Sequence, residues 1–184
     1  MNKQSKKILG LFARYFIILL FGIGNLYLIY LILTPITIQT LNSLLSIFIN
    51  TTLVGNIIYM DKAVIEIIPA CVAGAAFYLL LFLLLSMEDI NPKTRIKAII
   101  TAFAMLFILN ISRILILIPI INTSYFETIH WIFWHFISII FIVAVWFSVI
   151  KIYKIKSIPI YSDFKYIKGL IKPIKKSKRK KKHK

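Results

Sequence analysis

The chain has 184 residues, 60% of them hydrophobic, and its mean hydropathy is +0.87. Soluble globular domains are about half apolar, so the composition indicates an integral membrane protein and excludes an ordinary soluble enzyme. The formal net charge is +17, yet 14 of the 23 Lys and Arg residues lie from Lys151 onward. We expect this basic tail to lie against anionic lipid headgroups. No basic groove interleaved with aromatic residues accompanies it, so we expect no nucleic-acid partner.

The first half of the chain predicts three elements. An apolar run from about Ala13 to Leu33 is long enough for a retained spanning helix, which ends before Pro35 because proline cannot continue a helix. Residues 36–50 are shorter and more polar, so they predict an interfacial amphipathic helix, with a short or re-entrant span as the alternative. Residues 52–68 are rich in β-branched side chains around Asp61-Lys62 and predict two short strands joined by a turn, outside the bilayer.

Three further apolar runs predict spanning helices in the second half. The runs are about Ile67–Ser86, Ala98–Ile121 and Thr128–Ile150. The expected fold is therefore an all-α polytopic membrane protein with about four transmembrane helices, one interfacial helix and a short extracytoplasmic β-hairpin. Residues 1–150 would form one integral membrane domain, and residues 151–184 a basic cytoplasmic tail.

The distribution of basic residues predicts the orientation, because Lys and Arg concentrate in cytoplasmic loops. With both termini in the cytoplasm of a plasma-membrane protein, the inner side holds four basic residues at the N-terminus, three in the 87–97 loop and fourteen in the tail. The outer side, formed by residues 35–66 and 122–127, holds only Lys62.

Cys71, Arg113 and His135 each stand in a different predicted span. At ~1.5 Å per helical residue they lie roughly 6, 12 and 11 Å below the outer surface, so we treat their depths as equal. Each has a plainer interpretation on its own. A buried cysteine can be an inert small hydrophobe, a histidine can serve packing, and Arg113 can pair with Asn110 one turn away. His130 is an alternative to His135. Five residues separate the two histidines and place them on different helical faces, so we expect only one of them to serve the site.

These residue types fit cysteine-nucleophile chemistry. A thiol attacks as the thiolate, which burial disfavours and a nearby cation stabilises. An imidazole can take the thiol proton and later protonate a leaving amine. A guanidinium can also hold the oxyanion that develops on the attacked carbonyl. No ligand set for a metal or organic cofactor is present.

The same residues resemble the exosortase/archaeosortase family of membrane-embedded cysteine enzymes across residues 40–145. The matching blocks are Ala70-Cys71 followed by Gly74, Asn110-Ile111-Ser112-Arg113-Ile114, and His135 followed by Ser138 and Phe141. The chain departs from the family pattern at Val72-Ala73, where Ser/Thr-Gly is usual, and at Ile139, where a glycine is frequent.

The resemblance implies a cysteine peptidase or transpeptidase that processes exported proteins carrying a C-terminal tail of signature, apolar helix and basic cluster. Cys71 would be the nucleophile, Arg113 the thiolate and oxyanion stabiliser, and His135 the general acid/base. A lipid amine would be one acceptor for the acyl group. Two other classes stay open from the sequence: a non-catalytic membrane scaffold or assembly factor, and a small transporter with Arg113 lining an anion path.

Overall fold

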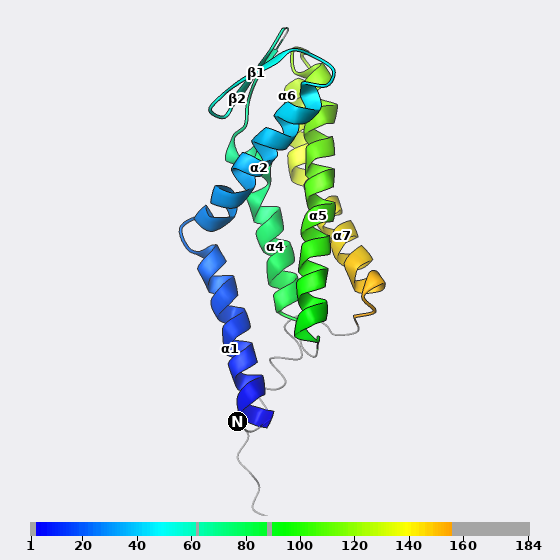
Figure 1. The fold of residues 1–184 in the computed structure, drawn as a ribbon. Helices are drawn as coiled ribbons and strands as arrows, with labels where there is room; N and C mark the ends of the chain where they lie inside the picture. The colour runs from blue at the N-terminus through cyan, green and yellow to red at the C-terminus, as the bar shows by residue number, and fades with distance from the viewer. Residues whose placement is uncertain (1–2, 62, 88–89, 156–184) are drawn as a thin grey trace, which may run out of the picture.

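A computed structural model describes residues 3–61, 63–87 and 90–155, and these are mostly helical (Figure 1). From position 156 onward the predicted tail lies outside the described residues. The helices are α1 (Lys3–Gly22), α2 (Tyr27–Leu45), α3 (Pro69–Val72), α4 (Gly74–Leu85), α5 (Pro92–Leu117), the 3₁₀ helix η1 (Ile118–Ile120), α6 (Phe126–Ile132), the π-helical segment η2 (Phe133–Ile137) and α7 (Ser138–Ile152). The strands are β1 (Thr51–Val54), β2 (Ile57–Met60) and β3 (Ala63–Glu66).

The elements run back and forth between two ends of the molecule (Figure 1). α1 and α2 lead from the N-terminal end to the sheet, and α3 with α4 return. α5 then runs toward the sheet end again, and α6 with α7 lead away from it. The sheet and the 121–125 turn therefore lie at the end opposite the start of α1.

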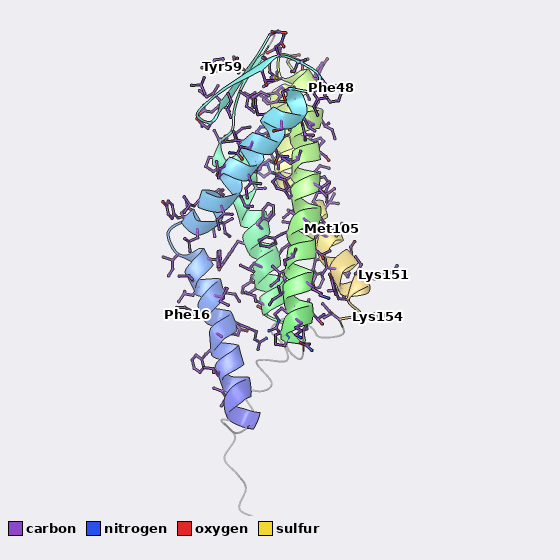
Figure 2. The ribbon with its side chains drawn as sticks, viewed as in Figure 1. Phe16, Phe48, Tyr59, Met105, Lys151 and Lys154 are labelled. Atoms are coloured by element: carbon purple, nitrogen blue, oxygen red, sulfur yellow. The ribbon has the colours of Figure 1, made fainter. Side chains whose placement is uncertain are left out.

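In the part of the chain that the structure describes, three helices are long and apolar enough to cross a membrane: Tyr27–Leu45, Pro92–Ile120 and Phe126–Ile152. Ile8–Gly22 and Gly74–Leu85 are apolar but shorter. Large apolar side chains also cover the outside of the helices, such as Phe16, which is 64% exposed and points away from its neighbours in Figure 2. These features are those of a helical membrane protein, but the predicted count of four spanning helices is not confirmed.

The predicted first span, Ala13–Leu33, is not one helix. It breaks between α1 and α2, where Gly24, Asn25 and Leu26 all have positive φ, between 54° and 65°. Glycine and asparagine adopt this left-handed conformation most readily. The Gly24-Asn25 pair is therefore the local reason for the break.

Pro35 does not end a helix, and residues 36–50 do not form a separate interfacial helix. α2 continues through Pro35 to Leu45. Proline removes the donor for the Leu31 carbonyl, but α2 buries Ile38, Leu41 and Leu45 in a core shared with the sheet, α3 and α5. Burial of these side chains offsets the lost hydrogen bond, so tertiary packing overrides the stop signal.

The predicted two-stranded hairpin is a three-stranded antiparallel sheet of order β1-β2-β3. The Asp61 turn joins β2 to β3, with Met60 opposite Ala63. A second turn at Gly55-Asn56 joins β1 to β2, with Val54 opposite Ile57 and φ 63° at Gly55. A two-residue hairpin turn needs positive φ, and Gly55 supplies it.

α4, α5 and α7 pack against one another around the largest apolar core. α5 begins at Pro92, earlier than the predicted Ala98, because the Asn91 side chain accepts a hydrogen bond from the Lys93 N–H (3.1 Å) and caps the helix. Asparagine before proline is a typical helix start. α5 is thus a long, well-anchored helix that carries Asn110 and Arg113 toward the sheet end.

Candidate active site

Cys71 lies on a single helical turn rather than inside a long helix. The predicted helix Ile67–Ser86 divides at Ala73, which has φ 58° and separates α3 from α4. Pro69 stands at the start of α3, where a missing N–H costs nothing. The Cys71 thiol is free and half-buried.

Two polar side chains of α5 hold this turn. The last carbonyl groups of any helix lack partners within the helix. Asn110 Nδ2 donates to the Cys71 carbonyl (2.8 Å) and the Val72 carbonyl (3.5 Å). Arg113 Nη2 donates to the carbonyls of Ala70 (3.1 Å) and Cys71 (3.4 Å). The pair therefore satisfies the C-terminal carbonyls of α3 and fixes Cys71 against α5.

Arg113 is 5% exposed. Its Nη1 donates to the Ser138 hydroxyl (3.0 Å), and that hydroxyl donates to the Phe133 carbonyl (3.0 Å). Within the described part of the chain these hydrogen bonds go to a hydroxyl and to carbonyls, none to a carboxylate, and Nε is buried without a partner. A buried cation without an anionic partner is expensive, so the arrangement favours an anion or a developing negative charge beside it.

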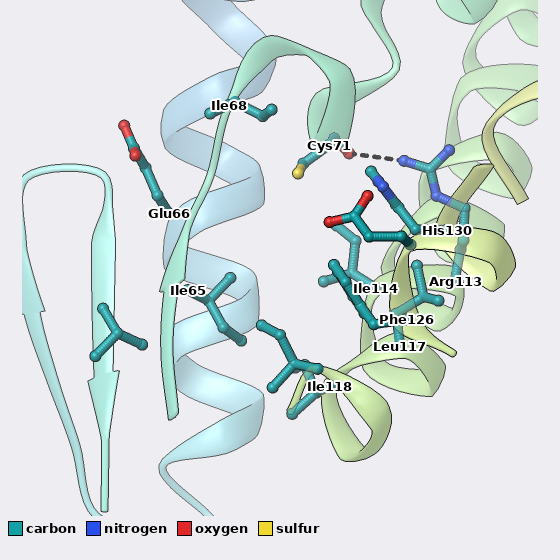
Figure 3. A pocket seen from close by; sticks show the side chains of 13 residues that line it. Ile65, Glu66, Ile68, Cys71, Arg113, Ile114, Leu117, Ile118, Phe126 and His130 are labelled. Atoms are coloured by element: carbon teal, nitrogen blue, oxygen red, sulfur yellow. Dashed lines mark hydrogen bonds between the residues drawn. The ribbon is translucent and has the colours of Figure 1, made fainter. Parts of the chain in front are cut away.

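Cys71, Arg113 and His130 line one cavity of about 300 Å³. Figure 3 shows the His130 ring pointing toward Cys71 and Arg113, and marks the hydrogen bond from Arg113 to the Cys71 carbonyl. The His130 ring also stacks on Phe126, with ring centroids 5.4 Å apart and planes at 5°. Much of the remaining wall consists of Ile and Leu side chains from β3, α5 and η1. The cavity thus joins a thiol, a cation and an imidazole in apolar surroundings.

His135 does not line this cavity. Its Nδ1 lies 2.9 Å from the Trp131 carbonyl oxygen. Its ring packs against Trp131 and Trp134, with centroids 4.5 and 4.6 Å apart. Of the two histidines, the geometry therefore favours His130, the alternative base, for chemistry at Cys71.

The π-helical segment η2 begins three residues after His130 and contains His135. It ends where the Ser138 N–H bonds to the Phe133 carbonyl, five residues earlier. A π segment accommodates one extra residue in a turn and changes which side chains share a face. Counting residues along a regular α-helix does not predict this change of face. The estimated depth in the membrane therefore did not show which of His130 and His135 lies beside Cys71.

Two carboxylates at the cavity were not predicted from the sequence. Glu66 on β3 and Glu127 on α6 both line the cavity and are exposed. Glu66 also accepts a hydrogen bond from Asn56 Nδ2 (3.1 Å). The available signal was their scarcity, because the chain has only six Asp and Glu residues. Among the described residues, no three His, Cys, Asp or Glu side chains gather in a group that could hold a metal ion.

Comparison with known protein families, curated proteins and solved structures gives no match for this chain.

Proposed function

We propose that this protein is a membrane-embedded cysteine peptidase or transpeptidase that processes the C-terminal sorting tails of exported proteins. The observation that carries the proposal is the shared cavity of Cys71, Arg113 and His130. The resemblance of the Ala70-Cys71 and Asn110-to-Ile114 blocks to the exosortase/archaeosortase family supports it. We assign the general acid/base role to His130 rather than His135, because His130 lines the cavity with Cys71.

Each step uses groups on the cavity wall. His130 takes the Cys71 thiol proton, and the thiolate attacks a peptide carbonyl while Arg113 stabilises the oxyanion. The C–N bond then breaks, and His130 returns the proton to the leaving amine, which leaves a thioester on Cys71. Water or the amine of an acceptor lipid attacks the thioester and releases the thiol. The first route is hydrolysis and the second transpeptidation.

The proposed orientation places the cavity at the outer face of the plasma membrane. The four passes between the two ends would be four spans, with α1 and α2 together making the first and α3 with α4 the second. Lys151 and Lys154 lie toward the end far from Tyr59 of the sheet in Figure 2, as cytoplasmic cations would. A secreted substrate still held by its tail helix would present its scissile bond at the outer end.

The test is maturation of a co-expressed surface protein with such a tail, followed by gel shift and C-terminal mass spectrometry. At matched membrane levels we expect Cys71→Ala to abolish cleavage. His130→Ala should lower it about 100-fold or more, the usual contribution of a general acid/base. His135→Ala is the matched control and should retain cleavage. Cleavage that persists in Cys71→Ala would overturn the cysteine mechanism.

A non-catalytic scaffold is the second candidate, because the hydrogen bonds of Asn110 and Arg113 also make sense as support for α3. In a scaffold, Cys71→Ser would keep both fold and function, since the serine hydroxyl is close to the thiol in size. In the proposed enzyme, Cys71→Ser keeps the fold but loses processing. Cell-surface assembly and substrate cleavage measured on the same variant distinguish the two.

A further inference from the structure

One edge of the small sheet borders the cavity. β3 pairs only with β2, so its other edge has no strand beside it in the described part of the chain. Val64, Ile65 and Glu66 of β3 all line the cavity. In Figure 3 the strand that carries Ile65 and Glu66 has the hairpin on one side and the cavity residues Ile114 and Ile118 on the other.

The register shows which backbone groups face this edge. The Ile67 N–H donates to the Asn56 carbonyl (2.9 Å), so the Asn56–Ile67 pair is hydrogen-bonded. Such pairs alternate along antiparallel strands. The N–H and C=O groups of Val64 and Glu66 therefore point away from β2. Among the described residues, no backbone hydrogen bond from outside the sheet reaches either residue.

We infer that an extended peptide segment of the substrate binds as an added strand on the open edge of β3, with its carbonyl presented to Cys71. This inference rests on the proposed function and names how its substrate is held. Backbone pairing at an exposed strand edge is a recurring mode of peptide recognition. Val64, Ile65 and Glu66 line the same cavity as Cys71, so a strand added at this edge would run along the cavity that holds the nucleophile.

Charge and lining favour a peptide of particular composition. The exposed charged side chains on the cavity wall are the carboxylates of Glu66 and Glu127, while the cation, Arg113, is buried. An acidic segment would meet two like charges at the entrance. An apolar or basic segment would fill the Ile-rich wall and complement the carboxylates. Arg113 lines the same cavity, so its positive charge would stabilise the oxyanion that develops on the attacked carbonyl.

The experiment uses the full-length protein in lipid nanodiscs and measures alkylation of Cys71, the only cysteine. The probe is a hexapeptide of alternating Val and Thr with a C-terminal chloromethyl ketone, from which the thiolate displaces chloride. A second peptide is N-methylated at alternate residues, which removes the donors that would pair with β3. We expect methylation to slow alkylation about tenfold, as the loss of one or two hydrogen bonds implies.

Two proline variants, one on each edge of the sheet, test the inference from the protein side. Val64→Pro removes an outward N–H from β3, which an edge strand tolerates, and should slow alkylation by the unmethylated peptide about tenfold. Leu53→Pro is the matched control, because the pairing of Val54 with Ile57 turns the Leu53 N–H outward on the opposite edge. Iodoacetamide, which needs no pairing, should alkylate both variants at the wild-type rate.

Three results would overturn the inference. Equal rates with the methylated and unmethylated peptides would exclude strand pairing on the unchanged protein, whatever the variants do. If an alkyl chloromethyl ketone alkylates Cys71 as fast as the peptide does, the cavity binds a lipid chain rather than a peptide strand. A Cys71 that reacts with neither iodoacetamide nor the peptide would overturn the proposed function as well, whereas fast iodoacetamide alkylation leaves that function standing.

Discussion

Ala73 holds a left-handed backbone conformation, with φ 58° and ψ 35°, directly after the turn that carries Cys71. A Cβ atom makes this conformation costly by roughly 1–2 kcal/mol relative to ordinary helical geometry. Ala73 is therefore a strained residue directly beside the turn that carries Cys71.

Ala73→Gly should therefore stabilise the protein by about 1 kcal/mol. Glycine relieves the backbone strain, and its greater conformational entropy in the unfolded chain offsets only part of that stabilisation. The expected change is a rise in thermal midpoint of about 2–4 °C, measured by intrinsic fluorescence in detergent. Ala73→Val is the control and should lower the midpoint, since a β-branched residue tolerates positive φ least. A midpoint that falls in Ala73→Gly would contradict the backbone conformation of the α3–α4 break.

Asn110 and Arg113 could be predicted as a pair from the sequence, but their partners could not. Their spacing of three residues indicated one helical face, and an arginine inside an apolar helix indicated a special role. The carbonyls that they bind exist as acceptors only because α3 ends after one turn. Position 73 is not a glycine, so the sequence gives no sign that α3 ends there. The hydrogen bonds of Asn110 and Arg113 to the carbonyls of α3 could therefore not be predicted.

At the scale of elements, α2 and α4 meet where Tyr30 covers Gly74. A Cβ built on Gly74 would lie 2.6 Å from Tyr30 Cε1 and 2.7 Å from Cζ, closer than such contacts occur. Absence of a side chain at Gly74 is therefore required for this contact. The contact also holds the start of α4, one residue after Ala73, against the helix that supports the sheet.

Gly74→Ala should destabilise the protein by roughly 1–3 kcal/mol through overpacking against the tyrosine ring. Adding Tyr30→Leu should recover roughly 1 kcal/mol of that loss, because the shorter side chain leaves room for the methyl group. Gly10→Ala on α1 is the matched control, as nothing lies within 4 Å of its added Cβ. The coupling is checked by the thermal midpoints of wild type, Gly74→Ala, Tyr30→Leu, the double variant and Gly10→Ala. Additive effects of Gly74→Ala and Tyr30→Leu would show that the two residues do not touch.

The elements were predicted well where hydrophobic length decided them and poorly where turns did. The apolar segments of α5 and of α6 to α7 emerged from the sequence because each is long and uninterrupted. The breaks at Gly24-Asn25 and at Ala73 and the turn at Gly55-Asn56 each depend on one to three residues at positive φ. Gly-Asn pairs are typical of such turns, so two of these three breaks had a signal, whereas Ala73 had none.

The same limit applies to the candidate site. Residue types in three apolar runs predicted the thiol and the guanidinium, which the fold does bring to one cavity. The choice between His130 and His135 depended on helix phase through η2, and a π segment has no reliable signature in a single sequence. The edge of β3 beside Cys71 required a three-dimensional register that periodicity cannot supply.

At the scale of the whole molecule, the two ends differ in charge and in the structural elements that they contain. The start of α1, the start of α5 and the end of α7 lie away from the sheet (Figure 1), and Lys93, Lys97 and Lys151 belong to these segments. The other end carries the sheet, the 121–125 turn and the mouth of the cavity. Cations concentrate on the cytoplasmic side of membrane proteins, so the cavity should open to the exterior.

Single cysteines placed at the two ends test this orientation directly. In a Cys71→Ala background, Ser124→Cys and Lys97→Cys each create one exposed thiol, since both native side chains are exposed. A membrane-impermeant maleimide added to intact cells should label Ser124→Cys and leave Lys97→Cys unlabelled, whereas both should react after the membrane is opened. The reverse labelling pattern would put the cavity in the cytoplasm. There the Cys71 site could not meet an exported substrate, so this outcome would remove the proposed function even if the thiol proved reactive.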